Sequence, residues 1–277
     1  MSFSHSNAVV GRDDACLDRS LISKTEQSAR FGPAIWFERS MNSLSDDERK
    51  AFARMALAGE VPAGVRSARD NFFPKVSKYK KGGVTAIVKT TLEGELIGNV
   101  VTTCSSRFFE PKIMDTVAWI MLGCDAYTTY PEKHVTINQV TGKCGARVDL
   151  VMRDFSQREN CAIIEVQAVG FSGKGMDKEY RHMIDTDEKG IPYPQINRKP
   201  DYTGAGAKRF APQISEKAAI AASWGTKLAV MIDYSFLKSM GRLVEVGTAD
   251  TPREHKLACS EVVWFVVDYD IYYRMYV

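Results

Sequence analysis

Hydrophobic residues recur at helical spacing in the segment that follows Ser45. From Phe52 onward, apolar side chains return every three or four positions, which is typical of one face of an α-helix. Glu48 stands three residues after Ser45, and this pair is typical of a capping box, in which the two residues satisfy each other's backbone amides. Gly59 then interrupts the pattern, as glycine commonly does at a helix end. The pattern predicts a helix that begins at Asp46 and ends before Gly59.

Further along the chain the pattern favours strands, with alternating or continuously apolar segments between polar turns. The predicted strand-like segments are 84–89, 94–104, 117–123, 134–140, 146–154, 161–171, 226–234 and 259–270. Helical patterns are found at 35–41, 209–224 and 235–240. The many Gly, Pro and charged residues of 170–207 predict a long loop or short irregular elements. This order of elements predicts a central mixed β-sheet flanked by helices, in the α/β or α+β class.

The composition is that of a folded protein. Hydrophobic residues make up 44% of the 277 positions, which excludes a disordered or low-complexity chain. The 37 Lys and Arg residues nearly balance the 34 Asp and Glu residues, and the formal charge of +3 excludes a histone-like polycation. The most apolar stretch, 117–124, is much shorter than the roughly 20 residues that span a bilayer, and no signal-peptide pattern opens the sequence. We therefore expect no membrane partner.

The cysteines favour a reducing environment. Six of them are spread along the chain, and none forms a CxxC pair. This usage fits free thiols in the cytoplasm, where disulfides are rare. Buried thiols that act as small apolar side chains are a simpler interpretation than a metal cluster.

Three polar side chains interrupt two strongly apolar predicted strands. Asp149 lies in RVDLV, and Glu165 and Gln167 lie two residues apart in IIEVQA, so these last two share one strand face. An antiparallel hairpin through 153–160 would place Asp149 beside Glu165, where two carboxylates repel each other unless a proton or a divalent metal lies between them. This arrangement favours a metal-dependent nuclease, in which Asp149 and Glu165 hold Mg²⁺ and Gln167 orients the water or contacts the phosphate. A satisfied acid and amide at a strand edge is the alternative.

The sequence around these residues resembles the NotI-type restriction endonucleases. The resemblance is carried, in order, by INQVTGKCGARVDLV, IIEVQAVGFSG, a Gln-Ile-x-x-Lys helix and KLAVMIDYSFLKSM, between about Asp125 and Asp268. It implies a PD-(D/E)xK restriction-endonuclease-like core with Gln in the lysine position. It further implies a type II restriction endonuclease that uses Mg²⁺ and works as a homodimer on double-stranded DNA at a specific, GC-rich palindrome. The matching catalytic residues are Asp149, Glu165 and Gln167, with Asp149 and Glu165 as metal ligands.

Lys217 is a further catalytic candidate. Gln213 and Lys217 stand four residues apart on the predicted helix and share one face of it. In the fold that the resemblance implies, this helix packs close to the active site, so Lys217 could supply the positive charge that Gln167 lacks. A solvated helix lysine is the alternative.

Candidate DNA contacts cluster in the second half of the chain. Residues 197–217 carry five basic against two acidic side chains, and a second basic segment lies at 75–81. Arginines can read guanine edges in the major groove, whereas lysines more often hold phosphates. The candidates are Lys174, Arg181, Arg198, Lys199, Lys208, Arg209 and Gln213. A solvated surface position is equally compatible with any one of them.

We expect a single nuclease domain over 1–277, in which 1–115 form an N-terminal elaboration and 116–277 the catalytic core. Two other functions stay open at this point. One is a non-specific or repair-type nuclease of the same fold. The other is an inactive nuclease-like DNA-binding protein, because Gln167 stands where a lysine would be expected.

Overall fold

The computed structural model describes residues 30–37, 39–60, 82–91, 96–131, 133–136, 145–170, 176–186, 200–202, 205–239, 261–269 and 275–276. The helical elements are η2 (Met41–Ser43), α2 (Asp46–Ala58), η4 (Ser105–Phe109), α4 (Pro111–Leu122), α5 (Met176–Asp185), α6 (Ala205–Ser223) and α7 (Tyr234–Ser239). The strands are β1 (Arg30–Trp36), β2 (Arg39–Ser40), β3 (Val84–Thr90), β4 (Leu96–Thr102), β5 (Tyr127–Pro131), β6 (His134–Thr136), β7 (Gly145–Arg147), β8 (Leu150–Asp154), β9 (Cys161–Gln167), β10 (Leu228–Asp233), β11 (Val262–Tyr269) and β12 (Met275–Tyr276).

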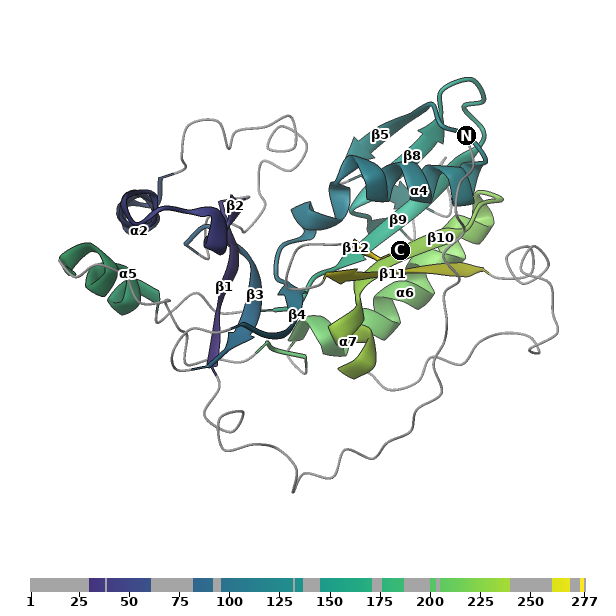
Figure 1. Ribbon diagram of the computed structural model, residues 1–277. Coiled ribbons are helices and arrows are strands. Elements are labelled where there is room, and N and C mark those ends of the chain that lie inside the picture. Colours follow the sequence, from purple (N-terminus) through teal and green to yellow (C-terminus); the bar gives the residue numbers. More distant parts are fainter. Residues whose placement is uncertain are drawn as a thin grey trace.

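One mixed sheet organises the fold (Figure 1). Its strand order is β2-β1-β3-β4-β11-β10-β9-β8-β5, and β12 pairs with β11 outside this path. β10 runs parallel to both β9 and β11, whereas β8 is antiparallel to β9 and β5 is antiparallel to β8. β6 and β7 form a separate antiparallel pair. The prediction of a mixed sheet flanked by helices, in the α+β class, is therefore confirmed.

Helices cover both faces of the sheet around β9 (Figure 1). On one face α4 contributes Val117 to the hydrophobic cluster that contains Ile164 of β9. On the other face α6 contributes Ala218 to the cluster that contains Ile163. Because β9 is buried on both faces, its sequence is mostly apolar, and its polar residues stand out.

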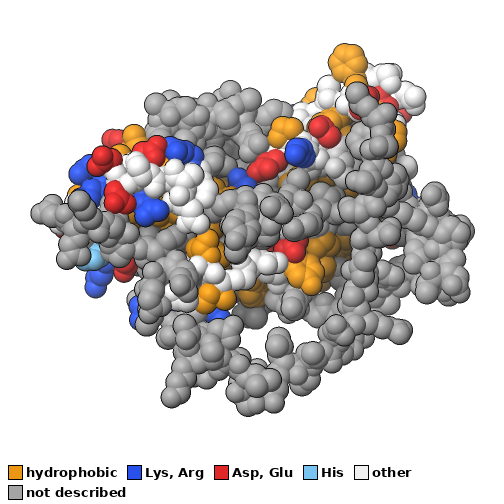
Figure 2. Space-filling view, in the orientation of Figure 1, with side chains coloured by type: hydrophobic (Ala, Val, Ile, Leu, Met, Phe, Trp, Pro, Cys, Tyr) orange, Lys and Arg blue, Asp and Glu red, His pale blue; other side chains and the backbone are white. Residues whose placement is uncertain are grey.

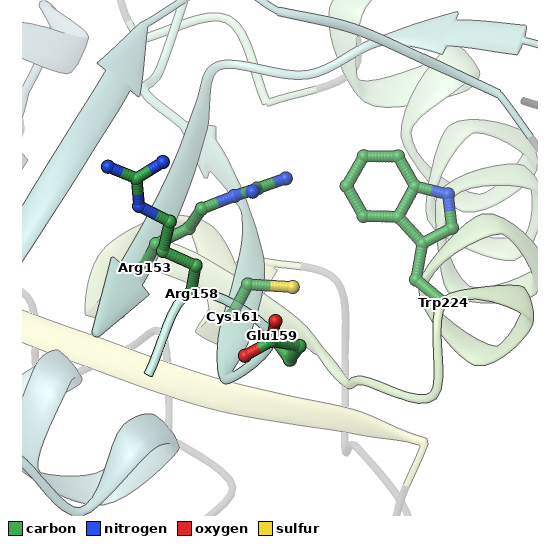
Figure 3. Close-up of a pocket in the computed structure, with 5 residues that line it drawn as sticks. All are labelled: Arg153, Arg158, Glu159, Cys161 and Trp224. Carbon is green, nitrogen blue, oxygen red and sulfur yellow. The ribbon is translucent and has the colours of Figure 1, made fainter. Parts of the chain in front are cut away.

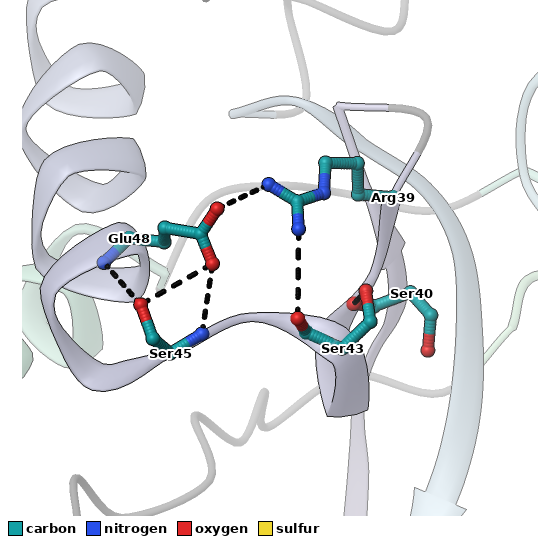
Figure 4. A network of polar contacts seen from close by, with 5 residues as sticks. All are labelled: Arg39, Ser40, Ser43, Ser45 and Glu48. Carbon is teal, nitrogen blue, oxygen red and sulfur yellow. Dashed lines mark hydrogen bonds and ion pairs between the residues drawn. The ribbon is translucent and has the colours of Figure 1, made fainter.

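The predicted helix after Ser45 and its capping box are both confirmed (Figure 4). The Ser45 hydroxyl accepts a hydrogen bond from the Glu48 amide (3.3 Å), and the Glu48 carboxylate accepts one from the Ser45 amide (2.9 Å). Arg39 forms an ion pair with the same carboxylate, which ties the start of α2 to β2. Gly59, at a φ of +71°, ends the helix.

The segment 117–123, predicted as strand-like, lies instead in helix α4. The buried stripe of this helix begins at Ile113, ahead of the apolar run, and Pro111 and Gly123 mark its two ends. An apolar run by itself does not distinguish a buried strand from a buried helix, and the stripe extends beyond the run. No helix in the described part of the chain combines the length and the apolar character needed to cross a membrane.

The helix predicted at 35–41 is also wrong. Residues up to Trp36 belong to β1, and Ile35 pairs with Ala86 of β3. The Phe37 amide then donates a hydrogen bond to the carbonyl of Gly83 (2.8 Å). Pairing with a strand that is distant in sequence overrides the local pattern here.

The loop predicted over 170–207 contains helix α5, so this prediction is wrong for that part. Met176, Tyr180 and Met183 are buried at helical spacing, and α5 packs on α2. The ring of Tyr180 stacks on Trp36, with 5.0 Å between the ring centroids. A helix of this length depends on such tertiary contacts, which the charged local sequence does not reveal.

Charged side chains of both signs intermix over α2 (Figure 2). Its first turn carries Asp46, Asp47 and Glu48, and basic residues follow directly. The described surface of this helix therefore carries no concentrated charge of one sign. The predicted basic segment 75–81 lies outside the described residues.

Candidate active site

The hairpin formed by β8 and β9 brings Asp149 and Glu165 together. Leu150 pairs with Ile164, so one further step along this antiparallel register sets Asp149 opposite Glu165. The Val166 amide donates a hydrogen bond to Asp149 Oδ2 (2.8 Å), which fixes the aspartate against β9. The predicted hairpin is confirmed. The predicted strand through Asp149 is wrong in one detail, because this residue lies in a bend just before β8.

The bend at Asp149 has a clear structural origin. β7 ends at Arg147 and β8 begins at Leu150, so the chain changes partners between these strands. The Val148 amide donates to the carbonyl of Lys133 (2.9 Å) instead of continuing the β8–β9 ladder. The aspartate side chain can therefore take the hydrogen bond of Val166 that a longer β8 would have taken.

Glu165 and Lys217 form a buried ion pair between β9 and α6. The Lys217 Nζ lies 2.5 Å from Glu165 Oε2. Glu165 is only 7% exposed, and Lys217 is only 5% exposed. The interpretation of Lys217 as a solvated helix lysine is therefore wrong.

The carboxyl group of Glu165 has an unusual proton affinity. Burial is the main cause that raises its pKa, the negative charge of Asp149 adds to the effect, and Lys217 opposes it, with a result of about 7. Apart from the Lys217 ion pair, Glu165 Oε2 has no hydrogen-bond partner among the described residues. The carboxyl group of Glu165 therefore holds its proton to a much higher pH than an ordinary glutamate does.

Gln167 lies two residues further along the same face of β9 and is half-buried. It pairs with Ile232 of β10, and its amide nitrogen donates to the carbonyl of Ala168 (3.0 Å). The structure thus brings Asp149, Glu165 and Lys217 into one cluster and places Gln167 beside this cluster at the end of β9.

The donor set suits a hard divalent cation. Asp149 and Glu165 offer carboxylate oxygens, and Mg²⁺ is commonly held by one or two carboxylates while it keeps several waters. A cation between them would also relieve the repulsion that raises the Glu165 pKa. In the described part of the chain, no group of three or more His, Cys, Asp or Glu residues is placed to hold a metal ion. Among the described residues, a third ligand would therefore be a backbone carbonyl or an amide oxygen.

The candidate DNA contacts divide into three groups. Arg209 is exposed and Gln213 is half-buried, and both stand on α6 at four-residue steps from Lys217. Arg181 is exposed on α5, which Figure 1 shows beyond β1, well away from β9. Lys174, Arg198 and Lys199 lie outside the described residues, and so does the side chain of Lys208.

Asp233 is a buried acid near the site that the sequence analysis missed. It is 1% exposed, and its carboxylate accepts hydrogen bonds from the amides of Thr102 and Ser235, both at 2.9 Å. Burial raises its pKa, and these hydrogen bonds oppose the rise. Asp233 thereby links β4 and the start of α7 to the end of β10, next to the residue that pairs with Gln167. Asp233 thus caps the start of α7. The sequence signal for such a cap is an Asp at the end of an apolar strand, two residues before a Ser.

The chain also matches a known protein family. The family model of the restriction endonuclease NotI matches residues 52–273, which is most of the chain. The protein is therefore a restriction enzyme, a site-specific deoxyribonuclease that acts on DNA. It belongs to the NotI restriction endonuclease family, whose type II enzymes generally use divalent metal ions. A comparison with curated proteins finds no match.

Proposed function

We propose that the protein is a Mg²⁺-dependent type II restriction endonuclease with a PD-(D/E)xK-type site. In this proposal Asp149, Glu165, Gln167 and Lys217 form the catalytic group. The observation that carries it is a buried carboxylate on a central strand, held between a second carboxylate and a buried lysine. Such burial is costly for stability, and strongly perturbed groups of this kind concentrate at functional sites.

Asp149 and Glu165 are the proposed ligands of Mg²⁺. When bound, Mg²⁺ would polarise the scissile phosphate and lower the pKa of the attacking water. The hydrogen bond from the Val166 amide keeps Asp149 Oδ2 in place, so one ligand is positioned before any cation arrives. Glu165 must lose its proton to become the second ligand, and its pKa near 7 allows this near neutral pH.

Lys217 supplies a fixed positive charge in this proposal. Its Nζ favours the ionised form of Glu165 and remains beside the place where the phosphate would lie. Negative charge builds up on the phosphate in the transition state, and a preorganised ammonium group stabilises it there. Gln167 can offer only a hydrogen bond to the water or the phosphate, so Lys217 takes the electrostatic role that Gln167 lacks.

The DNA approaches along α6 in this proposal. Arg209, Gln213 and Lys217 stand at four-residue intervals, so one helix face runs from the surface to the carboxylates. The remaining proposed DNA contacts are Lys174, Arg181, Arg198, Lys199 and Lys208.

The proposed assembly is a homodimer. Its twofold symmetry would match a GC-rich palindrome, and each protomer would cut one strand. Each protomer is a single nuclease domain in which 116–277 form the core and 1–115 an elaboration. The sheet that continues from β2 to β5 supports a single domain.

Digestion of phage DNA tests the proposal. Purified protein should cut the DNA into discrete fragments with Mg²⁺ and not with EDTA, and sequencing of the ends should give one palindrome. Glu165→Gln should lower the cleavage rate by about 10³-fold or more, while DNA binding survives. Lys217→Met should also lower the rate strongly, and Lys217→Arg should recover part of it.

Glu216→Gln is the matched control, because Glu216 is an exposed acid beside Lys217 on α6. It should cut at the wild-type rate. Cleavage by Glu165→Gln at a rate near wild type would overturn the site assignment. A smear of fragments would instead indicate a non-specific nuclease, and no cleavage of any DNA would indicate an inactive DNA-binding protein.

A further inference from the structure

The sheet face that carries Glu165 continues outward beyond α6. Residues opposite each other in an antiparallel pair lie on the same face, so Glu165 shares its face with Cys161, Arg153 and Tyr130. α6 packs on β9 and β10. Arg153 of β8 is only half-buried and Tyr130 of β5 is 41% exposed, so this outer part of the face reaches solvent.

Cations surround an aromatic ring on this outer part. The Lys133 Nζ lies 5.8 Å from the centre of the Tyr130 ring, and the Arg153 Cζ lies 5.9 Å from the same centre. These are cation–π distances, which hold the two long side chains over the ring. The Val148 amide donates a hydrogen bond to the carbonyl of Lys133, and Val148 directly precedes Asp149. The backbone of Lys133 therefore lies next to the chain that carries Asp149.

A pocket extends this group toward the turn of the hairpin (Figure 3). It is lined by Arg153, Arg158, Glu159, Cys161 and Trp224. Figure 3 shows the two arginines on one side of the pocket and the indole of Trp224 across from them. We call Lys133, Arg153 and Arg158, with the rings of Tyr130 and Trp224, the basic strip.

The cations of the basic strip are not engaged in ion pairs within the described part of the chain. Lys133, Arg153 and Arg158 form no ion pair with any described carboxylate, although Glu159 lines the same pocket. Like charges that are gathered in this way repel each other, and binding an anion would remove the repulsion. Lysine, arginine and exposed aromatic rings are the groups that hold the backbone and bases of nucleic acids.

The distance from the carboxylates to Arg153 of the basic strip suits several phosphates. Asp149 lies just before β8 and Arg153 within it, four residues further on, which is about 13 Å of extended chain. This distance equals the axial rise of about four nucleotides of one DNA strand, at 3.4 Å each. A DNA strand held at Asp149 could therefore reach Arg153 within about four nucleotides, and a single free phosphate could not contact both places.

We propose that the basic strip binds the sugar–phosphate backbone of the DNA next to the scissile phosphate. This inference rests on the proposed function, because it takes Asp149 and Glu165 as the cleavage site. The basic strip supplies affinity and fixes how the duplex lies, and Lys217 with the carboxylates supplies the chemistry. It adds Lys133, Arg153 and Arg158 to the DNA-binding surface of the protein.

The test compares Lys133→Ala, Arg153→Ala and Arg158→Ala with the full-length wild-type chain. The DNA probe is a duplex with the palindrome identified by digestion, and Ca²⁺ replaces Mg²⁺ in the binding assay. Each variant should bind about 5- to 20-fold more weakly, and its plot of log affinity against log salt should flatten by about one unit. Cleavage with Mg²⁺ at sub-saturating DNA should fall by about the same factor as the affinity, because fewer complexes form.

Lys112→Ala is the matched control, because Lys112 is an exposed cation on α4, on the opposite face of the sheet. It should leave both the affinity and the salt dependence unchanged. Arg153→Lys should keep part of the affinity, because it keeps the charge. Wild-type affinity and salt dependence in all three variants would overturn the inference.

Two further outcomes separate the possible failures. If inorganic phosphate at constant ionic strength protects Arg153 from modification and DNA does not, the basic strip is a small-anion site and the inference is wrong. If Glu165→Gln still cuts DNA while the strip variants bind it more weakly, the site assignment fails and the basic strip stands.

Discussion

Replacing Glu165 by Gln should change how the stability of the protein depends on pH. The carboxyl group has a pKa of about 7 in the folded protein, against an ordinary value of 4.5. The folded state therefore binds more protons than the unfolded state between these two values. The wild type should lose stability relative to Glu165→Gln as the pH rises through this window. More than about one pH unit below 4.5 the carboxyl group should have no such effect, and more than about one unit above 7 its effect should be nearly constant.

The magnitude follows from the pKa difference. At about 1.36 kcal/mol per pKa unit, the change from 4.5 to about 7 corresponds to about 3.4 kcal/mol in full. Between pH 5 and pH 8 the linkage relation gives about 2.5 kcal/mol of this total. The variant also leaves Lys217 without its carboxylate, which adds an offset that does not depend on the titration of Glu165.

Urea unfolding of both proteins at pH 5, 6, 7 and 8 measures the effect, in EDTA so that no cation binds the site. The free energy of unfolding of Glu165→Gln minus that of the wild type should increase by about 2.5 kcal/mol from pH 5 to pH 8. The exposed Glu216→Gln should show a nearly constant difference from wild type. If the difference in the free energy of unfolding between Glu165→Gln and the wild type is also constant over this range, the raised pKa of Glu165 is refuted.

Three further predictions concern metal binding and stability. The apparent Mg²⁺ affinity, measured by the Mg²⁺ dependence of cleavage, should fall about tenfold from pH 8 to pH 6 as Glu165 takes up its proton, and a pH-independent affinity would contradict this. Gly83→Ala should destabilise the protein by about 3 kcal/mol or more in urea unfolding, because the φ is +78° and the new Cβ would lie 2.4 Å from the Phe37 ring. Gly59→Ala, with a similar φ and open space around it, is the control and should cost only about 1 kcal/mol. Ser45→Ala should cost about 1 kcal/mol through loss of the helix cap, and an unchanged urea midpoint would contradict this role.

The parts of the fold that were predicted correctly are those that depend on local pattern. The helix after Ser45 has its capping signals within its own first turn. Asp149 and Glu165 come from neighbouring strands joined by a short polar turn, so alternation and hairpin geometry were enough to predict that they meet. The strands 161–167 and 228–233 were recognised because burial on both faces demands continuous apolar sequence.

The errors arose where distant contacts decide the local structure. Ile35 pairs with Ala86 across many residues, which turned a predicted helix into a strand. Tyr180 stacks on Trp36, which stabilises a helix inside a predicted loop. In both places the local sequence is compatible with more than one structure, and tertiary packing selects one.

The sequence by itself determined which residues are the candidates for the chemistry, because Asp149, Glu165 and Gln167 interrupt apolar segments. The tertiary structure alone decided their environment. Lys217 follows Glu165 by many positions in sequence, and only the packing of α6 on β9 and β10 buries its ammonium group against the carboxylate. The pKa of Glu165 and the partners of Asp149 depend on burial and on distances between charges. Those quantities exist only once the chain has brought distant segments together.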